Sequence, residues 1–188
     1  LLLGAIKSLV KALESTSYWT AGHTERVTEY AVGIGKIMGL KRELLKKLRI
    51  TSLLHDIGKI ATPKEILNKD CKLSESEWKE IRKHPSSGVE ILSELKQFEG
   101  IVLSIKYHHE HWDGEKGIFG LKKTKIPVMA RILAVADAFD ALTSNRPYRQ
   151  RKTKDDAIKE IVNCSGTQFD PVVVDAFLKW VKEFNLRH

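Results

Sequence analysis

Residues 132–142 read ILAVADAFDAL, and within this stretch only Asp137 and Asp140 are charged. Such a long apolar segment, with no strand-like alternation, predicts a helix in the interior of a helical bundle. The two aspartates are three positions apart, so they share one face of that helix. Because burying an unpaired carboxylate is costly, both side chains require a positive partner. A metal ion would neutralise both carboxylates. A salt bridge to Arg131 or Arg146 would neutralise one of the two carboxylates more easily than both.

Helical periodicity continues on both sides of this stretch. Apolar residues recur at three- and four-residue spacing over 2–13, 23–38 and 44–54, and we expect the third of these helices to end near Gly58. Further segments of this kind cover 74–81, 89–95, 101–108 and the stretch that begins at 171, while 110–125 forms one long loop. No convincing alternating strand interrupts them. The sequence therefore predicts an all-α helical bundle.

Local signals predict where several helices begin or end. Ser74 and Glu77 have the spacing of a capping box, Thr153 can cap a helix, and Gly39 is placed to end one. Residues 1–188 contain no linker, repeat or low-complexity tract, so we expect a single domain. Because the chain starts inside a helix without an initiator methionine, we expect it to be part of a longer protein.

Composition narrows the class of protein. Hydrophobic residues make up 42% and charged residues 30%, which is typical of a globular chain. No apolar run is long enough to span a membrane, and no signal peptide precedes the first helix, so we expect a cytoplasmic protein. Cys71 and Cys164 have no neighbouring cysteine, which argues against a disulfide scaffold or a thiolate zinc site. The net charge of +8 suits an anionic ligand such as a nucleotide or phosphodiester, although a solvated lysine-rich surface explains it equally well.

Histidines cluster with aspartates at predicted helix ends. His55 and Asp56 directly follow two leucines, where an HD pair is either a metal-ligand pair or a helix cap. His108 and His109 are expected on a helix, so their side chains would diverge by about 100° and suit one large site. The remaining candidates are His23 and His84. Together these imidazoles and carboxylates indicate a mixed nitrogen and oxygen site for iron, manganese or zinc.

Three cations accompany this cluster. Lys59 lies one turn beyond Asp56, and Arg146 and Arg149 follow the helix that contains Asp137. Cations beside a metal site are expected if the ligand is a phosphate, although each could equally be an ordinary surface charge.

The ordered motifs of the chain resemble the HD-GYP family within the HD phosphohydrolase superfamily. These motifs are HTER (23–26), HDIGKI (55–60), HP (84–85), HHEHWDG (108–114), DAFDALTS (137–144), RPYR (146–149) and GTQFDP (166–171). The resemblance covers about residues 15–180 and implies helices that converge on a cluster of metal ions. It implies a first metal held by His23, His55, Asp56 and Asp137, and a second held by His84, His108 and His109 with Asp56 as the bridge.

The same resemblance implies that Lys59, Arg146 and Arg149 contact substrate phosphate, with Asp56 and Lys59 as the catalytic residues. The two divalent ions are expected to be iron or manganese. A third metal is not expected, because Trp19 stands where three-metal members have a glutamate ligand.

The chain departs from the family after Gly114, where residues 115–120 read EKGIFG in place of a short Gly-Tyr-Pro turn. Without that proline, and with Gly117 and Gly120 nearby, we expect a loop that is mobile when empty. Ordering such a loop costs free energy on binding, so we expect weakened substrate affinity while the hydrolytic step survives.

The function implied by the resemblance is hydrolysis of cyclic di-GMP to linear pGpG, with GMP as a further candidate product. One alternative is an HD phosphohydrolase that acts on another cyclic dinucleotide or nucleotide. Another is a signalling or binding module with little activity. The expected partners are the cyclic dinucleotide and protein domains of the GGDEF type, and a homodimer is left open. Nucleic acid is not expected, because the basic residues form no stripe with interleaved aromatics.

Overall fold

The computed structural model describes residues 2–15, 22–145 and 151–185, and these form helices and their connections. The α-helices are α1 (Leu2–Glu14), α2 (His23–Ile37), α3 (Arg42–Leu54), α4 (Lys64–Leu67), α5 (Glu75–Ile81), α6 (His84–Ser93), α7 (Glu99–Lys106), α8 (Val128–Thr143), α9 (Lys154–Asn163) and α10 (Pro171–Asn185). Short 3₁₀ turns are η1 (Ile57–Ala61), η2 (Lys96–Phe98) and η3 (Lys123–Lys125). Within the described ranges, β-pairing is limited to one isolated bridge between Ser165 and Phe169. The predicted all-α fold is confirmed.

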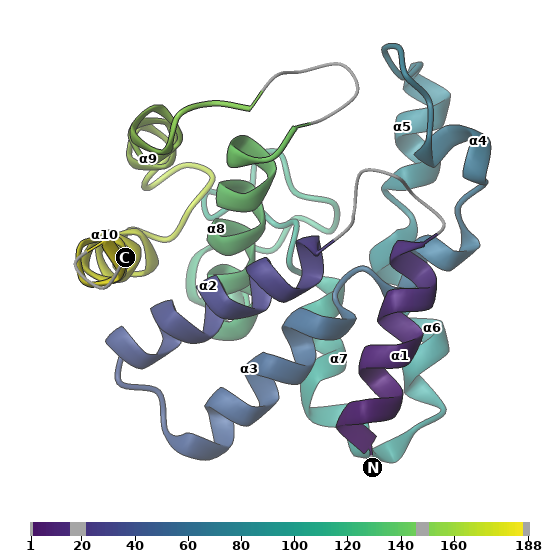
Figure 1. Ribbon diagram of the computed structural model, residues 1–188, viewed down its shortest axis with the longest axis horizontal. Helices are drawn as coiled ribbons and strands as arrows, with labels where there is room; N and C mark the ends of the chain where they lie inside the picture. Colours follow the sequence, from purple (N-terminus) through teal and green to yellow (C-terminus); the bar gives the residue numbers. More distant parts are fainter. Residues whose placement is uncertain (1, 16–21, 146–150, 186–188) are drawn as a thin grey trace.

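Helix α8 lies near the middle of the bundle (Figure 1), where it packs against α2, α7, α9 and α10. Its apolar residues include Ile132, Leu133 and Val135, each with no exposed surface. The hydrophobic effect therefore fixes this helix in the core, as its sequence predicts. Any polar side chain on α8 that points inward is held in a fixed position by this packing.

Three predicted helix ends are confirmed, whereas the helix expected to end near Gly58 ends at Leu54 and is followed by η1. The Ser74 side chain accepts a hydrogen bond from the Glu77 backbone, and the Glu77 side chain accepts one from Ser74, completing a capping box at α5. Thr153 caps α9 by accepting a hydrogen bond from the Asp156 backbone. Gly39 has a positive φ of 72° just after α2 ends, a conformation that glycine adopts without steric cost.

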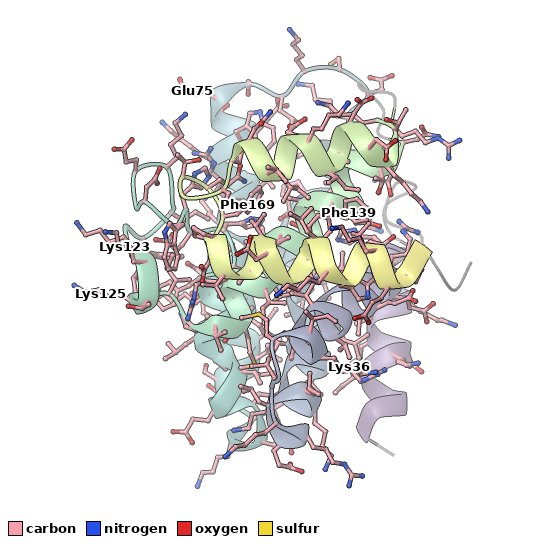
Figure 2. All side chains as sticks on the ribbon, turned by 90° about the vertical axis from the view of Figure 1, so that its left-hand side faces the viewer. Lys36, Glu75, Lys123, Lys125, Phe139 and Phe169 are labelled. Atoms are coloured by element: carbon pink, nitrogen blue, oxygen red, sulfur yellow. The ribbon has the colours of Figure 1, made fainter. Side chains whose placement is uncertain are left out.

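Helix α10 covers one flank of the bundle, beside α9 (Figure 2). The Phe177 ring lies 5.0 Å from the Phe139 ring on α8, centroid to centroid. Trp180 packs over Gly33 on α2 so closely that a Cβ at Gly33 would lie 2.1 Å from the indole nitrogen. These contacts fix α2 and α8 relative to each other.

No helix among residues 2–15, 22–145 and 151–185 combines the length and the apolar character that a membrane span requires.

Candidate metal centre

The predicted ligand residues meet where several helix ends converge on α8. His23 is the first residue of α2, His55 and Asp56 directly follow α3, and His84 is the first residue of α6. His108 and His109 lie just beyond α7, and Asp137 lies within α8. The structure gathers their ligand atoms into two neighbouring groups.

The first group contains His23, His55 and Asp56, all buried. One ligand atom from each lies within 4.8 Å of the others. Asp137 joins this group, because its Oδ1 atom lies 3.5 Å from His23 Nε2. Two imidazoles and two carboxylates at this spacing could hold one divalent ion of the iron, manganese or zinc class.

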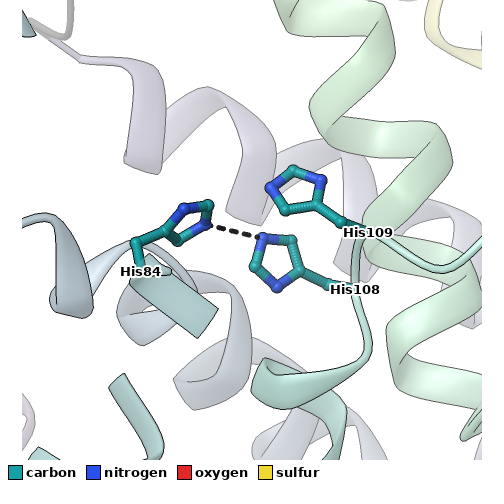
Figure 3. A group of neighbouring side chains, drawn as sticks. All are labelled: His84, His108 and His109. Atoms are coloured by element: carbon teal, nitrogen blue, oxygen red, sulfur yellow. Dashed lines mark hydrogen bonds between the residues drawn. The ribbon is translucent and has the colours of Figure 1, made fainter. Parts of the chain in front are cut away.

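The second group contains His84, His108 and His109, whose ligand atoms again lie within 4.8 Å of one another. Figure 3 shows the three rings converging, with His84 Nε2 and His108 Nε2 3.5 Å apart. The expectation that His108 and His109 lie on a helix was wrong, because α7 ends at Lys106. The 100° divergence applies only inside a helix. In the turn that follows α7 the two ring centroids are 4.0 Å apart and both rings face His84.

Asp56 lies between the two groups. Its Oδ2 atom is 3.6 Å from His23 Nε2 and 3.5 Å from His55 Nε2, in the first group. Its Oδ1 atom is 3.4 Å from His84 Nε2, in the second. Each oxygen of one carboxylate therefore faces a different set of imidazoles.

Backbone carbonyls orient three of the imidazoles. The Nδ1 atoms of His55, His84 and His108 donate to the carbonyls of Ser52 (2.7 Å), Ile81 (2.7 Å) and Ile105 (2.6 Å), respectively. A carbonyl only accepts, so Nδ1 carries the proton and Nε2 presents a lone pair to the centre. His55 Nε2 is buried and makes no hydrogen bond to any described residue. A metal ion would satisfy this buried acceptor, so the site fits the predicted cofactor.

Comparison with known proteins identifies the family. The sequence model of a family described as "HD domain" matches residues 7–173. The chain belongs to the HD domain family. It is 36% identical over 178 residues to a cyclic di-GMP phosphodiesterase of Pseudomonas aeruginosa, covering 94% of this chain and 42% of that protein. It is 35% identical over 181 residues to a 3'3'-cGAMP-specific phosphodiesterase of Vibrio cholerae, covering 95% of this chain and 35% of that protein.

The chain thus spans less than half the length of these two curated relatives. The family match and the relatives confirm the resemblance to the HD-GYP family. A crystal structure described as a cyclic GMP-AMP-specific phosphodiesterase of Vibrio cholerae shares the fold, with a TM-score of 0.72 at 22% identity. That alignment covers 95% of this chain and 48% of the other.

In this HD domain Asp140 binds the ring nitrogen of His23 that faces away from the metal centre. His23 Nδ1 donates to Asp140 Oδ2 at 2.7 Å, and Arg26 Nε donates to Asp140 Oδ1 at 2.6 Å. The arginine that pairs with Asp140 is thus Arg26, whereas Arg131 pairs with Asp170. Arg26 lies three residues after His23, and this one-turn spacing is the feature of the sequence that places the two side chains near each other. Asp140 fixes the proton on His23 Nδ1 and leaves Nε2 free to face the first group.

Electrostatics at the centre favour bound cations. Burial lowers the pKa of His84 to about 3 and that of His108 well below its usual range, so both are neutral near pH 7. Burial also lowers the pKa of His23, but hydrogen bonds with Asp140 and Asp56 outweigh it and raise the value to about 9. The carboxylates around His23 therefore stabilise positive charge, whether a proton or a metal ion provides it.

Lys59 lies at the edge of the centre, on η1. Its Nζ atom is 2.6 Å from Asp56 Oδ2, and its side chain keeps 23% of its surface exposed. It is therefore able to reach both the centre and a ligand arriving from solvent. Three other predicted positions, Arg146, Arg149 and Trp19, lie outside the described residues.

The loop at 110–125 differs from the expectation of a loosely held segment. The Glu110 carboxylate, which is 4% exposed, accepts hydrogen bonds from the backbone of Ile118, Phe119 and Leu121. The sequence reasoning considered only the missing proline and the glycines. Buried hydrogen bonds to a carboxylate provide the anchoring that proline would otherwise contribute.

Replacing Asp140 with asparagine should weaken metal binding at the first group by about tenfold or more. An amide places an NH2 donor at one of the two oxygen positions, where it faces either the Nδ1–H group of His23 or the Nε–H group of Arg26, so one of these two hydrogen bonds is lost. We expect metal titration of the apo protein to show this loss, with the second group unchanged within about twofold. The exposed Asp155→Asn variant is the matched control. Wild-type metal affinity in Asp140→Asn would show that the Asp140–His23 contact does not support the ligand.

Proposed function

We propose that this HD domain is a metal-dependent phosphodiesterase that hydrolyses cyclic di-GMP to linear pGpG. The observation that carries the proposal is Asp56, whose two oxygens face different groups of imidazoles at 3.4–3.6 Å. A shared carboxylate between two sets of ligands is the arrangement that places two ions close together. The relative from Pseudomonas aeruginosa, named a cyclic di-GMP phosphodiesterase, supports the choice of substrate.

In this proposal His23, His55, Asp56 and Asp137 hold one ion, while His84, His108 and His109 hold the other with Asp56. The nitrogen-rich donor set with carboxylates suits iron or manganese. When bound, two such ions lower the pKa of water and stabilise both the attacking and the leaving oxygen of an in-line displacement.

The residues of the chain orient this chemistry. The backbone carbonyls and Asp140 hold the imidazole Nε2 atoms toward the centre before substrate arrives, so little reorganisation is needed. Lys59 places an ammonium group beside the centre, where it stabilises negative charge on the nonbridging phosphate oxygens. Arg146 and Arg149 are proposed to contact the same phosphate. In the reaction one P–O3' bond breaks, water supplies the new phosphate oxygen, and the 3' oxygen leaves as a hydroxyl.

A second candidate substrate is 3'3'-cGAMP, because the Vibrio cholerae relative is named as specific for it. Both dinucleotides present the same phosphodiester to the centre and differ in one base. In this proposal the metal centre acts on the phosphodiester and not on the base, so its residues do not discriminate between the two dinucleotides. The assay must therefore include both.

The decisive experiment combines metal analysis with turnover. Protein purified without oxygen should contain two ions of iron or manganese per chain, and the same sample should convert cyclic di-GMP to pGpG. Parallel assays with 3'3'-cGAMP identify the preferred substrate, and any GMP marks a second hydrolysis. A sample with two ions per chain that hydrolyses neither dinucleotide would refute the proposed activity.

Replacing Lys59 with alanine should lower kcat by about 10²-fold while both metal ions remain bound. Lys59 competes with metal ions for the charge of Asp56, at 2.6 Å, so its loss does not weaken the ligand set. Steady-state kinetics and metal content measured on one preparation check both parts. Lys64→Ala, at an exposed position on α4, is the control. Loss of metal from Lys59→Ala would assign Lys59 a structural role at the centre.

A further inference from the structure

The turn formed by residues 107–110 presents two ligands of the second group. Helix α7 ends at Lys106, and the turn is closed by a 3.1 Å hydrogen bond from the Glu110 backbone to the Tyr107 carbonyl. His108 and His109 are its two central residues. Their convergence on His84 therefore depends on how firmly the two corners of the turn, Tyr107 and Glu110, are held.

Glu110 holds one corner. Its Oε1 atom accepts from Ile118 N at 2.6 Å and Phe119 N at 2.8 Å, and its Oε2 atom accepts from Leu121 N at 2.6 Å. Only 4% of Glu110 is exposed, so these backbone donors stabilise a buried carboxylate. Gly117 completes the fit, because a Cβ there would lie 2.7 Å from Oε1. We name residues 117–121 the clamp segment.

Phe119 of the same clamp segment holds the other corner. Its ring packs edge-on against Tyr107, with centroids 5.5 Å apart. Lys106 Nζ lies 5.0 Å from the centroid of the Phe119 ring and 5.5 Å from that of Tyr107. Phe119 thus contacts Tyr107 through its ring and Glu110 through its backbone. The clamp segment therefore contacts both corners of the turn that contains His108 and His109, Tyr107 by ring packing and Glu110 by hydrogen bonds.

We propose that Glu110 and Phe119 are positioning residues that set the affinity of the second group for its metal ion. The inference rests on the proposed function in one respect, that His84, His108 and His109 bind an ion. A fixed turn presents His108 and His109 already directed at His84, whereas a released turn must be ordered when the ion binds. The segment that replaces Gly-Tyr-Pro in this chain thereby serves the metal centre.

The test is a titration of the apo protein with Mn²⁺, in which calorimetry and electron paramagnetic resonance measure the binding steps. The binding step that His84→Ala abolishes is assigned to the second group. In Glu110→Gln and in Phe119→Ala that step should weaken by about tenfold or more, while the other step stays within about twofold. Phe119→Tyr keeps the ring and should bind Mn²⁺ like the wild type. Glu115→Gln makes the same chemical change as Glu110→Gln at an exposed position of the loop and is the matched control.

Only Glu110→Gln removes a carboxylate. If Phe119→Ala weakens Mn²⁺ binding at the second group to a similar extent, the loss comes from release of the turn and not from the lost carboxylate. Phe119 is 36% exposed, so Phe119→Ala decides the matter if Glu110→Gln does not fold. Equal weakening of both steps, or no weakening in Phe119→Ala, would overturn the proposal, as would a wild type that binds no second Mn²⁺. If the wild type bound two ions but did not hydrolyse cyclic di-GMP, the proposed function would be refuted, while the positioning role of Glu110 and Phe119 would still stand.

Discussion

Replacing Asp56 with alanine should remove both metal ions and reduce cyclic di-GMP hydrolysis by at least about 10³-fold. Asp56 Oδ2 faces the first group and Oδ1 faces the second, so one substitution removes a ligand atom from each. The second group is then left with imidazoles alone, and the first group keeps Asp137 as its one carboxylate ligand, so both groups attract a divalent ion less strongly. Metal analysis after anaerobic purification, together with turnover on the same sample, measures both effects.

The control for Asp56→Ala is Asp70→Ala, which removes an exposed carboxylate and should leave metal content and turnover unchanged. Circular dichroism should show wild-type helix content in both variants, because the contacts of Asp56 lie within the centre. If Asp56→Ala retained two ions per chain and normal turnover, Asp56 would not be the shared ligand. Retention of a single ion would show that the groups bind metal independently.

The helices of this protein are predictable because their signals are local. The apolar stretch at 132–142 and the capping box at Ser74 depend on residues within one or two turns of each other. Periodicity and hydrogen-bonding capacity over such distances are properties of the sequence itself. The same holds for Asp137 and Asp140, whose shared face on α8 brings both to His23.

The arrangement of the ligands was less predictable. His108 and His109 were assigned to a helix because apolar periodicity does not show that α7 stops at Lys106. The two groups around Asp56 came from the resemblance to a family, since residues from separate helices meet only after folding. Composition and spacing indicated a metal site with nitrogen and oxygen ligands, but they did not show which ligands belong to which of the two groups.

Contacts between distant parts of the chain were missed for the same reason. Glu110 accepts hydrogen bonds from residues eight to eleven positions later, across a loop without regular structure. Asp140 and Arg26 are 114 positions apart, and the one-turn spacing of Arg26 from His23 does not by itself show that both bind the same carboxylate. A buried carboxylate predicts that it has a partner, but the packing of helices decides which one.

Replacing Gly58 with alanine should lower the free energy of unfolding by about 3 kcal/mol and weaken metal binding at the second group. Gly58 lies on η1, which packs directly against α6. A Cβ at Gly58 would lie 1.9 Å from the His84 carbonyl oxygen and 2.5 Å from Gly88 N. Both obstacles are backbone atoms, so no side-chain rotation can relieve the clash.

The helix must therefore move away from η1, and that movement separates the two groups. His84 begins α6 and Asp56 immediately precedes η1, so the 3.4 Å contact between His84 Nε2 and Asp56 Oδ1 depends on this close approach. Gly88→Ala is the matched control, because its Cβ would meet the side chains of Ile57 and Ile105 at an ordinary 3.4 Å. Denaturant unfolding and Mn²⁺ titration should show a loss in Gly58→Ala only. Equal stability of the two variants would show that η1 and α6 tolerate separation, and that the geometry at Asp56 does not depend on their contact.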